Sequence, residues 1–146
     1  GHDIVIKSKR RLHELYRHYD GVIIDIFFDH YLAKNWSNYS EIPLDIFTNS
    51  INKLLDNKSP KLPEKSQRFI KYMIEYNILF NYQHIEGIEK VLEGMNKRTK
   101  GKSQMNLAIR DLRELDSEFN LDFKLFFKDL INFTNEKLSK IKRISI

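Results

Sequence analysis

Cysteine is absent from this sequence of 146 residues, which excludes disulfide bonds and thiolate metal sites. Without that sign of an oxidising compartment, a cytoplasmic location is the expectation. No apolar run approaches the ~18 residues that a membrane-spanning helix needs, and no signal peptide is visible, so we expect no membrane partner. Alternating apolar and polar runs and Asn-Gly turns, which are typical of β-strands and hairpins, are missing as well. These absences favour an all-α protein.

The composition is that of a globular domain with a positive charge. Hydrophobic residues make up 41% of the chain and aromatic residues 12%, enough for a sizeable core in one ordinary domain. The net charge of +5 favours an acidic partner, such as nucleic acid, anionic lipid or an acidic protein. That excess is modest for a dedicated nucleic-acid binder, so nucleic acid is not the partner we expect. The chain starts with Gly1-His2 rather than Met, which is typical of a cloning remnant or of a fragment.

Helical periodicity predicts a compact single-domain bundle of about six helices over residues 1–146. Apolar residues recur at intervals of three and four in most of the chain, and two prolines in the connector 57–63 interrupt the pattern. Ser8 is the expected N-cap of the first helix. The helical stretches cover residues 8–19, 21–36, 44–57, 64–82, 84–96, 104–115 and 118–141.

The segment 21–36, GVIIDIFFDHYLAKNW, is apolar at almost every position and is therefore expected to form a buried helix. It nevertheless carries Asp25, Asp29 and His30. A spacing of four residues puts the two carboxylates about 40° apart on one face of a helix. Because burying carboxylates without a partner costs several kcal/mol, the pair demands a cation.

Two sources of that cation are open. In the first, the aspartates pair with basic residues in a buried salt-bridge network, and His30 is hydrogen-bonded in the core. In the second, the three side chains bind a metal, since carboxylates and neutral imidazole are ligands for Mn²⁺, Fe or Zn²⁺ and facing helices of a bundle often build such sites. Three ligands are too few for a closed site, so others would come from other helices or from outside this chain.

The run DIFFDHYLAKNW, preceded by SKRRLHELYRHYDGVI, resembles the core motif of the acyl carrier protein phosphodiesterases. The stretch from Tyr72 to Tyr82, then Gly87-Ile88 and the run VLEGMNKR ending at Arg98, are similar to the second half of that family in order and spacing. The resemblance covers most of the chain. Members are bacterial all-α enzymes regarded as divergent relatives of the HD-type metal phosphohydrolases, so the resemblance implies an HD-like all-α fold.

The resemblance also implies a hydrolase of lipid metabolism and fatty acid biosynthesis, which removes 4′-phosphopantetheine from a serine of holo-acyl carrier protein to give the apo form. A divalent metal is implied with it, most often Mn²⁺, with Mg²⁺ or Fe²⁺ as alternatives. Carried over by position, Asp25 and Asp29 would be metal ligands or orient the attacking water. His30 would be a ligand or the proton donor to the leaving serine oxygen. Full-length members begin with a further helical region rich in His and Asp, so we expect this chain to be the C-terminal two-thirds of a longer protein.

Four residues are candidate substrate-binding groups. Arg98 is either a solvated cation at a helix end or a clamp that gives phosphoryl oxygens two parallel hydrogen bonds, and the resemblance favours the clamp. Asn77 interrupts an apolar helix and is either a pocket residue or a satisfied core amide. Lys9 and Arg10 belong to the basic clusters at 7–11 and 97–102, which would attract the strongly acidic carrier protein. The aromatic residues of this region are interpreted as core packing: Tyr31, Trp36, Tyr72, Tyr76 and Tyr82.

Two hypotheses follow, and they differ in what surrounds the aspartates. If the protein is a metal-dependent phosphodiesterase, Asp25 and Asp29 converge on a cavity open to solvent, with Arg98 or another cation at its rim. An HD-like phosphohydrolase acting on another phosphoester, such as a nucleotide, gives the same arrangement. If the protein is a non-catalytic helical module that binds an acidic protein or nucleic acid, each aspartate pairs with a buried Arg or Lys and no cavity reaches it. No glycine-rich phosphate loop or Ser/His/Asp order supports another class of enzyme.

Overall fold

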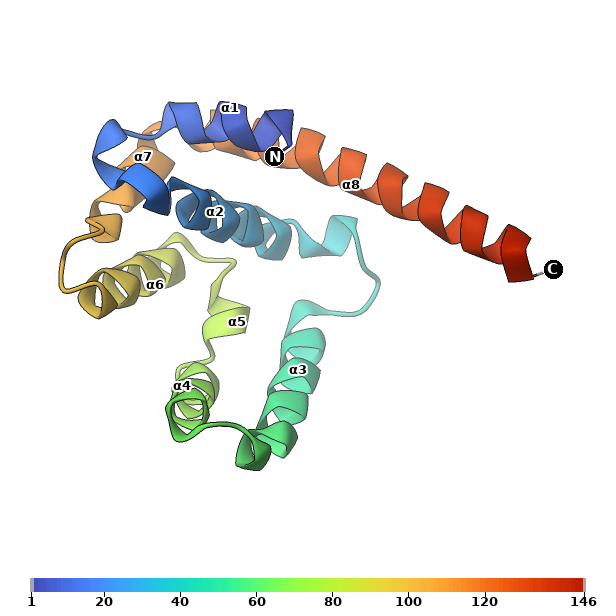
Figure 1. Cartoon of the computed structure of the whole chain (residues 1–146), viewed down its shortest axis with the longest axis horizontal. Helices are drawn as coiled ribbons and strands as arrows, with labels where there is room; N and C mark the ends of the chain where they lie inside the picture. Colours follow the sequence, from blue (N-terminus) through green and yellow to red (C-terminus); the bar gives the residue numbers. More distant parts are fainter. Residues whose placement is uncertain (1, 146) are drawn as a thin grey trace.

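The computed structural model describes residues 2–145, and every regular element among them is a helix (Figure 1). The prediction of an all-α fold is therefore confirmed. Gly1, part of the expected cloning remnant, and Ile146 lie outside the described residues. Within the described part of the chain, no helix is both long and apolar enough to cross a membrane. The α-helices are α1 (Asp3–Arg11), α2 (Asp20–Lys34), α3 (Leu44–Lys58), α4 (Glu64–Glu75), α5 (Ile78–Asn81), α6 (Ile85–Arg98), α7 (Ala108–Glu114) and α8 (Asp116–Ser145), with short 3₁₀ helices η1 (Glu14–Tyr19), η2 (Trp36–Asn38), η3 (Ser59–Lys61) and η4 (Met105–Leu107).

The core is organised around α2, which contacts α1, α6 and α8. Its side chains Ile23, Phe27 and Tyr31 are fully buried. Phe27 meets Phe119 of α8 edge to face, with the ring centroids 5.0 Å apart, and Tyr31 donates a hydrogen bond to the carboxylate of Asp116 at the start of the same helix, 2.6 Å away. Burial of each such side chain stabilises the fold by roughly 1.5–3 kcal/mol. The apolar pattern of 21–36 thus correctly located the central helix.

Among the residues whose burial the structure describes, two carboxylates other than those of α2 are buried. Asp122 of α8 is fully buried and receives a bidentate pair of hydrogen bonds from Arg11, from Nε at 2.7 Å and from Nη2 at 3.2 Å. Ser8 donates a third hydrogen bond to it, at 2.6 Å. The expected role of Ser8 as an N-cap is therefore wrong, because Ser8 lies inside α1 and is buried against α8. Asp111 of α7 is buried in the same way and pairs with Nδ1 of His13.

Breaks within the expected helices raise their number to eight α-helices among residues 2–145. The expected helix 64–82 ends at Glu75, because Asn77 adopts the left-handed conformation with φ 49° and ψ 47°. Asparagine tolerates this conformation better than most residues do. The short helix α5 follows and turns the chain back toward α6. In the same way, Gln104 has φ 54° and delays the expected helix 104–115, so that α7 begins at Ala108.

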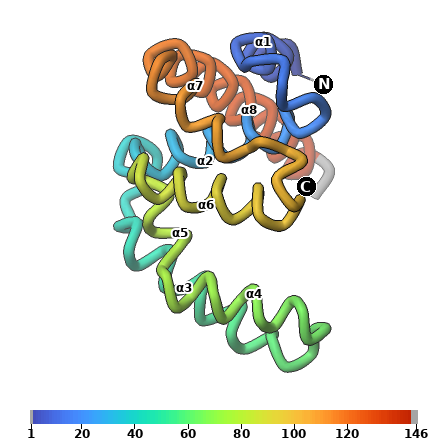
Figure 2. Tube along the Cα trace, turned by 90° about the vertical axis from the view of Figure 1, so that its left-hand side faces the viewer, coloured from blue at the N-terminus to red at the C-terminus, as the bar shows by residue number. Residues whose placement is uncertain are grey.

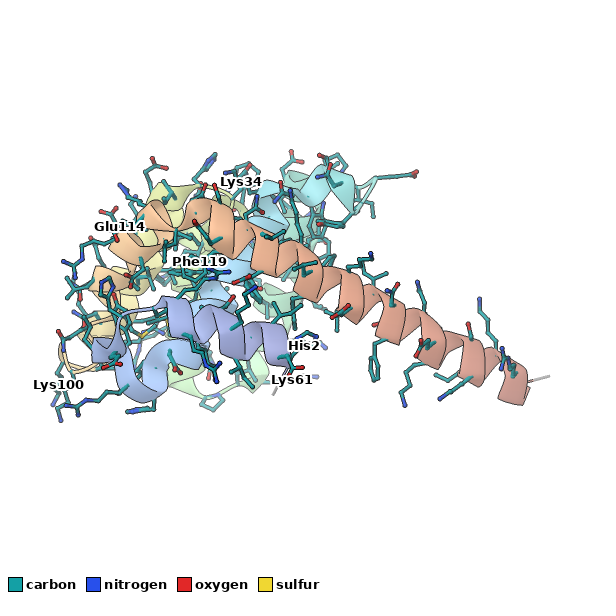
Figure 3. The ribbon with its side chains drawn as sticks, turned by 90° about the horizontal axis from the view of Figure 1, so that it is seen from above. His2, Lys34, Lys61, Lys100, Glu114 and Phe119 are labelled. Atoms are coloured by element: carbon teal, nitrogen blue, oxygen red, sulfur yellow. The ribbon has the colours of Figure 1, made fainter. Side chains whose placement is uncertain are left out.

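Two parts of the chain project from the packed helices. The hairpin of α3 and α4 extends away from α2 and α6 (Figure 2). In the described residues α3 buries only Thr48 and Asn52, and α4 buries only Ile70. The second half of α8 also extends past the body, beyond the part that contains Phe119 (Figure 3). The inner face of the projecting hairpin therefore remains available to form one wall of a groove.

Candidate functional site

One strip of α2 faces solvent and carries both aspartates. Val22, Asp25 and Asp29 are exposed, whereas most other residues of the helix are buried. The expectation of a helix buried on all sides is therefore wrong for this strip, because α1, α6 and α8 leave it uncovered. Neither carboxylate forms an ion pair or hydrogen bond with another described residue. The buried salt-bridge network expected under the non-catalytic hypothesis does not form here.

The ionisation of Asp29 is shifted by its surroundings. Loss of hydration among the surrounding protein atoms, and then the negative charge of Asp25, raise the pKa of Asp29 to about 6. Asp29 keeps one side open to solvent, so an ion can reach it without rearrangement of the fold. A pair of unpaired acids whose charges repel is stabilised by any cation that binds between them.

His30 lies on a different side of α2. Its side chain is buried, and Nδ1 donates a hydrogen bond to the backbone carbonyl of Tyr82 at 2.6 Å. Because a carbonyl oxygen only accepts, this bond places the proton on Nδ1 and leaves Nε2 as the unprotonated nitrogen. Burial lowers the pKa of His30, so the imidazole is neutral at physiological pH. The structure thus uses His30 to fix the Tyr82 segment against α2, and does not bring it to the two aspartates.

The side chains available as ligands limit the kind of metal site that this chain can form. Among residues 2–145, no three side chains of His, Asp, Glu or Cys lie close enough together to hold a metal ion. Asp25 and Asp29 alone fit a site of the magnesium or manganese type, in which one or two carboxylates bind the ion and water and substrate phosphate complete its shell. They do not fit a closed structural site, which needs a full set of protein ligands.

A groove of about 430 Å³ lies beside this strip, between α4, α5 and α6. Phe69 and Tyr72 of α4 and Tyr76, which directly follows that helix, form one wall. Val91 and the other groove-facing residues of α6 form the opposite wall, and Ile26 of α2 closes the upper edge. The volume falls within the range of small-molecule sites, about 300–1,000 Å³.

The acid strip and the groove meet at two points. Ile26 precedes Asp29 by three residues and therefore lies next to it on the surface of α2. Tyr82 lines the groove, and the negative charge of Asp29 adds to burial in raising the pKa of its phenol. The carboxylates themselves lie outside the lining of the groove, at its edge.

The four candidate substrate-binding residues lie in different parts of the structure. Arg98 lines the groove, and its guanidinium lies 4.6 Å from the centroid of the Phe69 ring, which holds it there. Asn77 is exposed at the break before α5, outside the groove lining. Lys9 lies 4.0 Å from Asp20 near the start of α2, and Arg10 is exposed on α1. Of the four, only Arg98 reaches the groove.

Sequence reasoning missed the groove itself. Tyr31 is a core residue as expected, but the packing interpretation is wrong for Tyr72 and Tyr76, which are 43% and 58% exposed. A usable signal was present in Gly87 and Gly94, because two glycines spaced seven residues apart lie on one face of a helix and leave two positions of that face without side chains.

We expect Asp29→Asn to stabilise the fold in a pH-dependent way when divalent ions are chelated. Because the folded pKa of about 6 lies above the ordinary value of 3.8, the folded state binds the extra proton, and Asp29 lowers stability as the pH rises from about 4 to 6. The variant should match wild type below pH 4 and exceed it by less than about 1 kcal/mol at pH 7, since exposed charges are screened. Urea denaturation at both pH values measures this. An equal difference in stability between the variant and wild type at both pH values would exclude titration of Asp29 as the cause.

Comparison with known proteins points to one family. A family model described as acyl carrier protein phosphodiesterase matches residues 1–130. A protein of that name from Photorhabdus laumondii is 24% identical over 137 residues, which are 93% of this chain and 69% of that protein. Another from Klebsiella pneumoniae is 25% identical over 120 residues, 80% of this chain and 61% of that protein. A third, from Pectobacterium atrosepticum, is 21% identical over 124 residues, 84% of this chain and 64% of that protein. No solved structure matches.

Proposed function

Because the chain belongs to the acyl carrier protein phosphodiesterase family, we propose that it hydrolyses the phosphodiester that joins 4′-phosphopantetheine to a serine of acyl carrier protein. Water adds to phosphorus, the bond from phosphorus to the serine oxygen breaks, and the serine oxygen takes a proton. The products are apo-acyl carrier protein and free 4′-phosphopantetheine. The observation that carries this proposal is the pair Asp25 and Asp29, two unpaired carboxylates at the edge of a groove of ligand size.

Asp25 and Asp29 hold a divalent ion in this proposal, with Mn²⁺ as the first choice and Mg²⁺ or Fe²⁺ as alternatives. Such an ion, when bound, polarises a phosphoryl oxygen and makes the attacking water more acidic. The two carboxylates would supply the negative charge that holds the ion beside the phosphodiester, and neither needs to leave another partner first. The matched regions span only 61% to 69% of the three relatives. The activity of the whole enzyme is therefore a proposal for this chain.

The roles of the other candidate residues follow from where their side chains lie. His30 is neutral and its proton lies on Nδ1 in the bond to Tyr82, so its role is to hold the Tyr82 segment and not to protonate the leaving oxygen. Arg98, held over Phe69, presents guanidinium N–H groups to oxygen atoms of the substrate in the groove. Lys9 and Arg10 contribute to the net charge of +5 that draws in an acidic carrier protein.

Mass spectrometry tests the proposal directly. Holo-acyl carrier protein is incubated with the protein and Mn²⁺, and loss of the phosphopantetheine mass is followed over time. We expect apo-acyl carrier protein to accumulate only when a divalent ion is present. No loss with Mn²⁺, Mg²⁺ or Fe²⁺ would contradict the proposal. Hydrolysis of a simple aryl phosphodiester without loss from the carrier protein would instead indicate a different phosphoester substrate.

A further inference from the structure

We propose that the groove between α4 and α6 binds the pantetheine arm of the carrier protein, and that Gly94 provides the room for it. This inference rests on the proposed function, because the arm is the part of that substrate that lies beyond the phosphodiester. It concerns a binding surface separate from the aspartates, since neither Asp25 nor Asp29 lines the groove.

The lining of the groove suits the chemistry of this arm. Pantetheine is an extended, uncharged chain that combines methyl and methylene groups with amides, a hydroxyl and a terminal thiol. It therefore needs apolar walls with a few polar groups between them. Phe69, Val91 and Met95 supply apolar walls, while the hydroxyl of Tyr72 and the side-chain oxygen of Asn81 supply hydrogen-bonding groups. The volume of about 430 Å³ lies within the range of small-molecule sites and accommodates an extended chain of this kind.

The position of the groove agrees with the order of groups along the substrate. The phosphodiester has the serine on one side and the pantetheine arm on the other. With the phosphodiester at Asp29, the arm reaches the groove past Ile26, which is the neighbour of Asp29 on α2 and part of the lining. Helices α2 and α6 lie side by side, so an extended chain that enters there continues along α6 (Figure 1).

Two glycines of α6 that line the groove differ in what surrounds them. A Cβ on Gly87 would lie 2.1 Å from the carbonyl oxygen of Asn81, so the packing of α5 against α6 requires glycine there. A Cβ on Gly94 would meet nothing within 4 Å. Packing therefore does not require glycine at position 94, although glycine weakens a helix. The open space above Gly94 is the space we assign to the pantetheine arm.

The variant Gly94→Leu fills this space and should leave the fold intact. Leucine is a strong helix former, and its side chain would enter open space, so the thermal midpoint should equal or exceed that of wild type. We expect KM for holo-acyl carrier protein to rise at least tenfold, with kcat changed less than threefold. The matched control is Gly94→Ala, whose single methyl group should change KM less than threefold.

Binding is measured separately from hydrolysis by NMR with free pantetheine and, in a second arm, coenzyme A. On wild type, we expect pantetheine to shift the amide signals of α4 and α6, and Gly94→Leu to abolish these shifts. Shifts with coenzyme A and no acceleration of holo-acyl carrier protein hydrolysis would identify free coenzyme A as the source of the arm, against our assignment to the carrier protein.

The outcomes separate this inference from the proposed function. Pantetheine binding that depends on Gly94, with no signal shifts from coenzyme A and no hydrolysis, would support the groove and overturn the hydrolase. Hydrolysis with the same KM in wild type and Gly94→Leu, and no signal shifts in the groove, would overturn the groove and leave the hydrolase standing. If Gly94→Leu does not fold, the wild-type shifts alone decide, and their absence from α4 and α6 overturns the inference.

Discussion

Replacing Arg11 with methionine is expected to destabilise the protein by about 3–5 kcal/mol, the cost of leaving a buried charge without its partner. Asp122 is fully buried, and Arg11 supplies two of the three hydrogen bonds that its carboxylate accepts from side chains of α1. Methionine keeps most of the length of the side chain, so the loss is mainly one of charge and hydrogen bonds. Urea denaturation followed by circular dichroism measures the change.

The chain offers a matched control in Arg10, the neighbouring arginine on α1. Arg10 is exposed, and we expect Arg10→Met to change stability by less than about 0.5 kcal/mol. In the double variant Arg11→Met with Asp122→Leu, no unpaired buried charge remains at this site, so much of the stability should return. If the double variant is less stable than Arg11→Met alone, packing around α8 and not the unpaired carboxylate is the source of the loss.

The helices could be predicted from the sequence where an apolar stripe repeats without interruption. This was so for α2, α3 and α6, whose observed bounds lie within a few residues of the expected ones. The breaks between helices were harder to predict. Asn77 adopts the left-handed conformation before α5, and nothing in the apolar pattern of the sequence indicates this. A local pattern reports which face of a helix is apolar, and it does not report a single residue that leaves helical geometry.

The spacing of Asp25 and Asp29 correctly put both on one face of α2, but the burial expected for them was wrong. Whether a strip of a helix is covered depends on where its neighbours pack, and that information is not local. The acids that are buried could not be predicted for the same reason. Asp122 is 111 residues from Arg11, and Asp111 is 98 residues from His13, so no local motif links them. The groove likewise depends on where the α3–α4 hairpin lies relative to α6.

Asp29→Asn is expected to lower kcat/KM for holo-acyl carrier protein by at least ~10³-fold. Charge stabilisation at a phosphoryl group by a bound ion is worth several kcal/mol, and each 1.36 kcal/mol is a factor of about ten in rate. Asparagine keeps the shape of the side chain and loses the negative charge that binds the ion. We expect Asp25→Asn to have a similar effect, because the two carboxylates act on the same ion. The loss of mass from the carrier protein, measured at several Mn²⁺ concentrations, gives the rates.

Loss of activity in Asp29→Asn cannot come from unfolding if the variant is also more stable than wild type at pH 7. An acid that lowers stability and raises activity is typical of a functional site, since the same unpaired charge that costs folding energy binds the ion. Asp56→Asn is the control, because Asp56 is an exposed acid on α3 outside the groove lining, and its activity should match wild type. Equal rates for wild type, Asp29→Asn and Asp25→Asn would exclude the acid pair from catalysis, and α2 would then be a structural helix alone.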